Sequence, residues 1–416
     1  MDDLEDRLAE LRGDALLRRL RVVSTEQGPR VTVDGRPVLL LCSNNYLGLA
    51  GDARVREAAA EAALRWGAGA GASRLISGNM TVHDELEHAL ADFTGHERCL
   101  LFGSGYLANT GIVSALARRG GVVLSDELNH ASIVDGCRLA RAETVVYRHA
   151  DLDHLASELR RRPERQALIV TDAVFSMDGD VAPLAGIVEL ARRHGARVMV
   201  DEAHATGTVG PGGRGAVADA GLTGEVDVVV GTLGKALGSY GAYACCGATV
   251  ADWLVNTARS LIFSTALPPP AVAAAQAALA SLRSEPQRVE RVRGNARVLR
   301  EALAGQGAAV APQATPVVPF VPLVIGAAEA TVLACERALA LGVFAQAIRP
   351  PTVPEGTSRL RLAVMATHAD AELREAARVV ARAVAAERGS PAGGDGSSRA
   401  PELGSGAADA ALRAAA

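Results

Sequence analysis

The sequence predicts an α/β protein, with a large domain built on a mostly parallel sheet and a smaller α+β domain after it. Between residues 52 and 284, short apolar runs alternate with longer stretches that carry apolar residues at helical spacing. Such alternation is typical of parallel strands covered by helices. After three prolines at 268–270 the pattern of apolar residues changes and predicts a few strands separated by helices. The 416 residues, 49% of them hydrophobic, are enough to bury the cores of two such units.

The first 50 residues are expected to form a helix and short strands that pack with the smaller domain. Leucines recur at helical spacing between charged residues over 4–22, which predicts an amphipathic helix. Two short strands are expected to follow, at 31–33 and 38–41.

The large domain is expected over residues 51–284 and the smaller one over 285–387. Strand candidates in the large domain are the apolar runs 121–125, 144–147, 167–171, 197–200 and 226–230. Those in the smaller domain are 317–324, 343–348 and 359–364. Residues 388–416 have the composition of a disordered tail, because glycine, serine and alanine dominate and no apolar periodicity is present.

Charge and composition favour a small-molecule ligand over nucleic acid or a membrane. The net charge is −4, and the arginines are spread among acidic residues. The first residues are acidic where a signal peptide would be basic, and no apolar run reaches membrane-spanning length. The six cysteines form no Cys-x-x-Cys pair and are expected to be reduced thiols. A cytoplasmic protein is therefore expected.

Lys235 is the only lysine in the chain. Arginine can replace lysine at most surface positions, but not where a nucleophilic amine must lose its proton and form an imine. Lys235 follows the apolar run 226–230, and glycines flank it at 231, 234 and 238. These glycines allow the backbone to lie close to a ligand. The alternative interpretation is that GC-rich coding replaced the other lysines with arginine and that Lys235 remained by chance, without a function.

Three common glycine-rich enzyme motifs do not match. A phosphate loop requires glycine at 229 and serine or threonine at 236, where the chain has Val229 and Ala236. Residues 67–71 miss the dinucleotide-binding spacing. Residues 103–105 are not a nucleophile elbow, because the flanking residues stand at the wrong offset.

Asp201 ends an apolar run, and His204 follows three residues later. Side chains at the carboxyl ends of parallel strands point into the ligand crevice of such sheets. A metal site and a solvated acidic turn are the alternatives, but no third metal ligand stands at helical spacing. An aspartate beneath a pyridine nitrogen would keep that ring protonated, as pyridoxal phosphate chemistry requires. Gly103 and Gly105 open a helical stretch whose N-terminus could receive the phosphate.

Taken in order, these motifs resemble the fold-type I pyridoxal-phosphate enzymes and, among them, the α-oxoamine synthases. The resemblance runs from about 38 to 385. The segments that carry it are 43–49, 73–78, 129–132, 175–180, 201–204 and 231–238. It implies a transferase with a mostly parallel seven-stranded sheet. It also implies a homodimer whose active sites are shared across the interface.

The resemblance also implies a role for each site residue, with pyridoxal 5'-phosphate as cofactor and no metal. The implied catalytic residues are Lys235, which forms the imine, Asp201, which pairs with the pyridinium nitrogen, and His130, which stacks on the ring. The implied cofactor-binding residues are Gly105, Tyr106, Ser176, Asp201, His204, Thr232, Lys235, Ser264 and Thr265, the last two reaching across the dimer interface. The implied substrate-binding residues are Arg18, Asn44, His130, Thr352 and Arg361. For Arg18, neighbouring arginines could take the same place.

The late segments 347–354 and 358–362 resemble the branch that condenses L-alanine with pimeloyl-CoA or a pimeloyl carrier-protein thioester, releasing CO₂. A sister synthase that uses glycine and another acyl-CoA is the first alternative. A non-catalytic scaffold of the same fold is the second, although it would not need to keep the lysine, the aspartate and the histidine. Asp172 departs from the glutamate that is usual in the family, and its shorter arm is expected to shift a contact behind the site.

Overall fold

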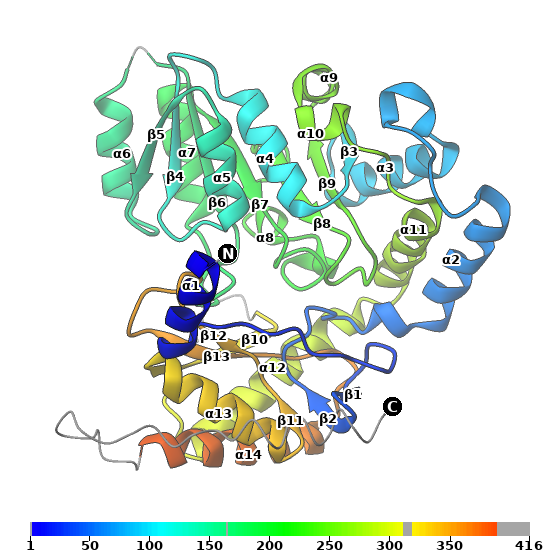
Figure 1. Cartoon of the computed structure of the whole chain (residues 1–416). Helices are drawn as coiled ribbons and strands as arrows, with labels where there is room; N and C mark the ends of the chain where they lie inside the picture. The colour runs from blue at the N-terminus through cyan, green and yellow to red at the C-terminus, as the bar shows by residue number, and fades with distance from the viewer. Residues whose placement is uncertain (1, 164, 311–317, 389–416) are drawn as a thin grey trace.

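A seven-stranded sheet dominates the larger of two lobes (Figure 1). The computed structural model describes residues 2–163, 165–310 and 318–388. The strand order in the sheet is β3-β9-β8-β7-β6-β4-β5. Only β9 runs antiparallel to its neighbours, so the predicted mostly parallel α/β fold is confirmed. The strands are β3 (Arg98–Phe102), β4 (Val122–Asp126), β5 (Glu143–Tyr147), β6 (Ala167–Asp172), β7 (Arg197–Asp201), β8 (Val228–Thr232) and β9 (Ala242–Cys246).

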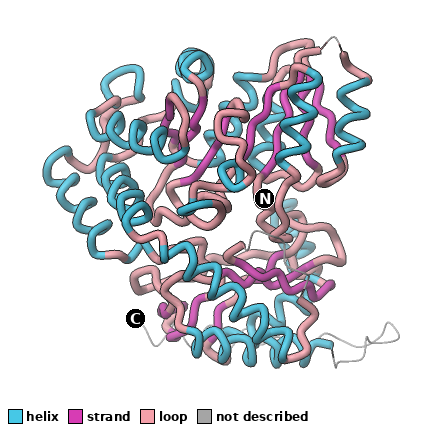
Figure 2. The backbone as a smooth tube through the Cα atoms, turned by 180° about the vertical axis from the view of Figure 1, so that it is seen from behind, coloured by secondary structure: helices cyan, strands magenta, loops and turns pink. Residues whose placement is uncertain are grey.

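Helices cover both faces of this sheet, as seen from both sides in Figures 1 and 2. Alternate residues of a strand point to opposite faces, so Val229 joins one apolar core while Val228 and Val230 join the other. The second core is closed by α4 (Gly105–Leu116), α5 (Ala131–Leu139), α9 (Ala248–Thr257) and α10 (Arg259–Ile262). The first is closed by α2 (Ala53–Trp66), α3 (Thr81–Thr94), α6 (Leu152–Arg160), α7 (Leu184–His194), α8 (Ala216–Asp219) and α11 (Pro269–Ser284).

The smaller lobe contains two three-stranded sheets, β1-β2-β11 and β10-β13-β12. The N-terminal strand β2 pairs in parallel with β11, so the beginning of the chain is built into this lobe. Its strands are β1 (Arg30–Val33), β2 (Arg36–Leu40), β10 (Phe320–Gly326), β11 (Val343–Phe344), β12 (Ala347–Ile348) and β13 (Ser358–Ala363). Its helices are α12 (Gln287–Gly305), α13 (Ala328–Ala340) and α14 (Asp370–Arg388). The domain boundaries at 50, 284 and 387 stay predictions, and residues 389–416 lie outside the described residues.

The predicted helix over 4–22 is too long. Helix α1 (Asp2–Gly13) ends at a glycine, and Ala15 follows in the left-handed region with φ of 55°. The next residues leave the helix because tertiary contacts hold them: Arg349 donates hydrogen bonds to the carbonyl oxygens of Ala15 and Leu17. In Figure 1, α1 lies between the two lobes.

Three further differences concern strands. Strands β3 and β9 were not expected from the sequence; β3 has four apolar residues after Arg98, and β9 has five. The run 343–348 was expected to be one strand, but it divides into β11 and β12. The division occurs because the chain passes from one sheet of the smaller lobe to the other.

Among the described residues, no helix is long and apolar enough to cross a membrane.

Candidate active site

The carboxyl ends of the parallel strands meet at one edge of the large sheet, and the predicted polar residues gather there. Asp201 ends β7, and Lys235 lies three residues after the end of β8. Because β7 and β8 are paired neighbours, their register brings the loop of Lys235 beside Asp201. Helix α4 begins at Gly105, shortly after β3 ends on the same edge.

The amine of Lys235 is close to His204. The Lys235 Nζ and His204 Nε2 atoms are 2.7 Å apart. Burial lowers the pKa of Lys235 to about 8, against the opposing effect of the Asp201 charge, and Arg361 lowers it further. Burial also holds the pKa of His204 well below its usual value, with the positive charges of Lys235 and Arg361 acting in the same direction. His204 is therefore neutral, and its Nε2 atom can accept a hydrogen bond from the amine.

Asp201 is buried and held by two donors. Its Oδ2 atom accepts a hydrogen bond of 2.6 Å from Asn109 Nδ2, and its Oδ1 atom accepts one of 2.8 Å from the backbone N–H of Ala203. Asn109 also donates to Ser132 Oγ at 2.8 Å, and Ser132 Oγ lies 2.7 Å from His130 Nδ1. The structure thus joins Asp201 and His130 through Asn109 and Ser132, two residues that the sequence analysis did not select as site residues.

Arg361 reaches the site from β13 of the smaller lobe. Its Nη2 atom donates to the hydroxyl of Tyr46 at 3.0 Å, and its Nη1 atom donates to Asn44 Oδ1 at 3.1 Å. The Tyr46 hydroxyl also lies 2.7 Å from His204 Nδ1. The guanidinium packs 4.0 Å from the ring centroid of Phe320, which leaves its edge for hydrogen bonding. Tyr46 therefore connects Arg361 to His204, and it too was missed, although it lies in the motif 43–49.

Ser176 and Thr232 border this cluster. The Ser176 carbonyl oxygen accepts a 2.6 Å hydrogen bond from Arg361 Nε, so its backbone meets the arginine directly. Thr232 ends β8, and its hydroxyl donates to the carbonyl oxygen of Gly241 and accepts from the N–H of Gly234. These contacts fix the loop that carries Lys235.

Gly105 and Tyr106 form the first turn of α4. A Cβ atom added to Gly105 would meet nothing within 4 Å, so the helix N-terminus opens into free space. Ser104 caps the helix by accepting from the Leu107 N–H. Tyr106 is 47% exposed, and its hydroxyl donates to Asp135 at 2.5 Å. Free backbone N–H groups at such a terminus can bind a phosphate.

Four predicted residues lie apart from this cluster. Ser264 and Thr265 line a small pocket with Phe102 and Gly103, which precede α4. Arg18 donates to the carbonyl oxygen of Pro350 at 3.0 Å, which places it beside the turn that contains Thr352. The predicted roles of these four residues stay predictions.

Asp172 ends β6 and supports the turn that carries His130. Its Oδ2 atom accepts a 2.7 Å hydrogen bond from the backbone N–H of His130. Burial raises the pKa of Asp172 well above its usual value, and the nearby Asp201 charge raises it further. Asp172 therefore acts on His130 through the backbone, and the expected shift caused by its shorter arm stays a prediction.

The residues present fit pyridoxal phosphate. A buried amine, a buried carboxylate on the adjacent strand and an open helix N-terminus supply partners for its aldehyde, ring nitrogen and phosphate. Among the described residues, the buried Oδ1 atom of Asn109 has no hydrogen-bond partner, so it is free to accept from a bound group. No group of three or more His, Cys, Asp or Glu side chains in that part of the chain is placed to hold a metal ion.

Comparisons with known proteins agree on the family. The model of the aminotransferase class I and II family matches residues 36–380. The chain is 51% identical to an 8-amino-7-oxononanoate synthase of Anaeromyxobacter dehalogenans over 374 residues, which is 90% of this chain and 93% of the relative. It is 48% identical to that of Citrifermentans bemidjiense over 383 residues, 91% of this chain and 97% of the relative.

Solved structures show the same fold. A serine palmitoyltransferase variant from S. paucimobilis with a bound PLP–myriocin aldimine superposes with a TM-score of 0.88 at 33% identity, covering 93% of this chain and 98% of its own. An 8-amino-7-oxononanoate synthase from Francisella tularensis superposes with a TM-score of 0.72 at 24% identity, covering 84% and 99%. The fold-type I architecture expected from the sequence is confirmed. The chain belongs to the aminotransferase class I and II family, alongside the 8-amino-7-oxononanoate synthases.

Proposed function

We propose that this protein is a pyridoxal-phosphate-dependent 8-amino-7-oxononanoate synthase of biotin biosynthesis. It condenses L-alanine with pimeloyl-CoA, or with a pimeloyl carrier-protein thioester, and releases CO₂ and the free thiol. The observation that carries the proposal is the buried amine of Lys235, the one lysine of the chain, next to His204 and beside Asp201. The high identity to synthases of this name over nine-tenths of the chain supports the choice of substrates.

Bound pyridoxal phosphate supplies a ring that takes up the electron pair when a bond at the α-carbon of the amino acid breaks. Asp201 would keep a proton on the ring nitrogen, because a buried negative charge stabilises a positive ring. The pKa of Lys235, lowered to about 8 by burial, leaves part of the amine neutral near pH 7.5, so Nζ can accept the α-proton. Arg361 would bind the carboxylate of L-alanine, and the imidazole of His130 would contact the cofactor ring.

The chain's own lysine makes the cofactor test direct. Borohydride reduction of the protein with pyridoxal phosphate is expected to add one cofactor mass, located on the peptide that contains Lys235. The Lys235→Ala protein should add none. Formation of 8-amino-7-oxononanoate from L-alanine and pimeloyl-CoA, followed by mass spectrometry, then tests the substrates. Turnover of glycine with another acyl-CoA and none of L-alanine would move the assignment to a sister synthase.

We infer that the enzyme is a homodimer. Three large apolar side chains are exposed on neighbouring segments: Leu75 is 51% exposed, Ile76 80% and Phe263 70%. These segments are adjacent because Ser73 and Thr265 form a β-bridge. An apolar patch of this kind is typical of an interface, and a second copy of the chain would cover it. It would also place Ser264 and Thr265, beside Phe263, at the subunit boundary.

Light scattering tests the dimer. Phe263→Asp is expected to shift the protein from dimer to monomer, whereas Leu64→Asp, at a leucine of α2 that is 91% exposed, should leave the mass unchanged. A monomeric wild-type protein would contradict the inference.

A further inference from the structure

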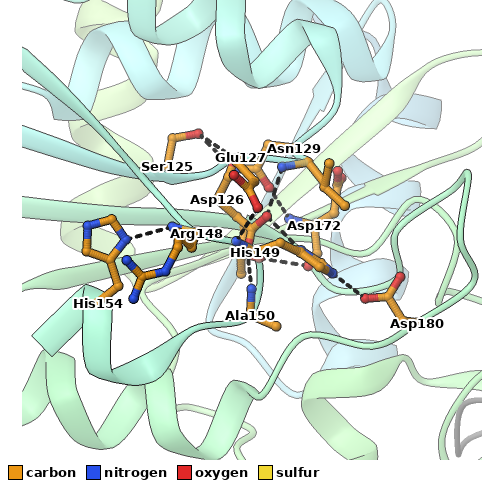
Figure 3. A network of polar contacts seen from close by, with 12 residues as sticks. Ser125, Asp126, Glu127, Asn129, Arg148, His149, Ala150, His154, Asp172 and Asp180 are labelled. Carbon is orange, nitrogen blue, oxygen red and sulfur yellow. Dashed lines mark hydrogen bonds and ion pairs between the residues drawn. The ribbon is translucent and has the colours of Figure 1, made fainter. Parts of the chain in front are cut away.

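His149 lies between two carboxylates that come from different parts of the large sheet (Figure 3). Its Nδ1 atom is 2.9 Å from Asp126 Oδ1, at the end of β4. Its Nε2 atom is 2.5 Å from Asp180 Oδ2, in the loop that follows β6. The rings of His149 and Phe175 pack edge to face, with their centroids 4.4 Å apart and an angle of 87° between the ring planes.

Both contacts require a proton on the histidine nitrogen or on the carboxylate. Ionised carboxylates only accept hydrogen bonds, and a neutral imidazole carries a single N–H. Both contacts are made at once when His149 is an imidazolium. Partial burial by itself lowers the pKa of His149, but the hydrogen bonds and charges of Asp126 and Asp180 outweigh it and raise the pKa to about 10.

Asp126 is a fixed anchor for this contact. It is 2% exposed, and it also accepts hydrogen bonds of 2.9 Å from the backbone N–H groups of Leu128 and Ala150. The strand register places Asp126 opposite Tyr147, two residues before His149. The sheet therefore holds one side of the imidazole rigidly.

Asp180 belongs to a loop that is closed on itself. The Phe175 N–H donates to the carbonyl oxygen of Asp180 at 3.0 Å, and the Gly179 N–H donates to that of Phe175 at 2.8 Å. Gly179 has φ of 80°, a conformation that favours glycine. These two hydrogen bonds hold the loop 175–180 together as one turn, and His149 attaches it to the sheet through Asp180.

The opposite side of this loop meets the smaller lobe. The carbonyl oxygen of Ser176 accepts from Arg361 Nε at 2.6 Å, and that of Met177 accepts from Arg359 Nη1 at 3.1 Å. Arg359 also pairs with Asp178 at 2.5 Å. The loop is therefore fixed by His149 on one side and supports the substrate arginine on the other.

We propose that His149 is a positioning residue, which holds loop 175–180 through Asp180 and thereby sets the orientation of Arg361 for the carboxylate of the amino acid substrate. His149 itself need not touch the substrate. The charged groups around it are Asp126 at the end of β4, Glu127 directly after that strand, Asp180 in the loop after β6, and Arg148 on its own segment, which pairs with Asp151. The choice of L-alanine as the ligand rests on the proposed function.

The first experiment measures the proton on His149 by NMR of protein labelled with ¹⁵N-histidine. At pH 8 both ring nitrogens of His149 are expected to carry protons, and Asp180→Asn should lower the titration midpoint. The control variant His88→Asn changes an exposed histidine of α3, away from this network, and should leave the His149 signals in place. A midpoint near the ordinary value of about 6.5 overturns the proposal.

The second experiment separates positioning from loss of structure by steady-state kinetics. His149→Asn and Asp180→Asn are expected to raise the KM for L-alanine roughly tenfold, because each removes one hydrogen bond to a charged group. The kcat of each variant should stay within about threefold of the wild-type value. The ratio of variant to wild-type KM should fall toward one as the pH approaches 10, where the wild type also loses its imidazolium proton. His88→Asn should behave like the wild type.

An unchanged KM for L-alanine, or a ratio that is the same at pH 7 and pH 10, would overturn the proposal. If His149→Asn does not fold, Asp180→Asn decides the question, because its side chain is 36% exposed and the change is nearly isosteric. If the wild type does not bind L-alanine, the proposed function fails. The role of His149 is then decided independently by the NMR measurement and by hydrogen exchange. The second compares the protection of backbone amides 175–180 in His149→Asn with that in the wild type.

Discussion

The amine of Lys235 is expected to react as a neutral nucleophile near physiological pH. A pKa of about 8 leaves roughly a quarter of the amine neutral at pH 7.5, against about 0.1% for the ordinary lysine value near 10.4. The neutral fraction is thus about 200 times larger in the folded protein. Burial is the main cause, so the effect should vanish when the chain unfolds.

Acetylation of the cofactor-free protein measures this pKa directly, because the chain has one lysine. A trace of acetic anhydride at each pH, followed by mass spectrometry of the Lys235 peptide, gives the midpoint. The N-terminal amine, with an ordinary pKa of about 7.7–8.0, is read on its own peptide. The same protein in denaturant is the control and should give a midpoint near 10.4.

Two substitutions should move the midpoint in opposite directions. The charge of Asp201 raises the pKa of Lys235, so Asp201→Asn should lower the midpoint further. The charge of Arg361 lowers it, so Arg361→Gln should raise the midpoint. A native midpoint within half a unit of 10.4 would refute the reasoning, because burial would then have no effect on the amine.

Three other predictions concern stability and cofactor affinity. Gly238→Ala should destabilise the fold by at least about 1 kcal/mol in urea unfolding, because Gly238 has φ of 60° and its Cβ would lie 2.3 Å from the Ala50 nitrogen; an unchanged midpoint would contradict this. Asn109→Ala should weaken pyridoxal phosphate binding at least roughly tenfold by fluorescence titration, because buried Asp201 loses a donor; equal affinity would contradict that role. The stability contributed by His149 is present in full below its unfolded pKa of about 6.5 and is lost as the pH rises through its folded pKa of about 10. The unfolding free energies of the wild type and His149→Asn should therefore converge over that pH range, and a difference that grows with pH would contradict this.

Local sequence was sufficient to predict the residues at the strand ends. Asp201 and Lys235 each follow an apolar run, and a residue directly after a parallel strand lies at the carboxyl edge whatever the strand order is. The strands β3 and β9 were missed because a run of four or five apolar residues without a period does not distinguish a strand from part of a buried helix. The end of α1 was missed because the leucine spacing continues past Gly13, whereas the helix ends there.

The sequence by itself determined the α/β class, the resemblance to one enzyme family and the single lysine proposed to carry its chemistry. Only the tertiary structure decided which side chains support these residues. Tyr46 joins Arg361 to His204, and His149 joins Asp126 to Asp180, across large separations in the chain. The physical reason is that such contacts depend on strand order, register and the docking of the two lobes. Local periodicity contains none of that information.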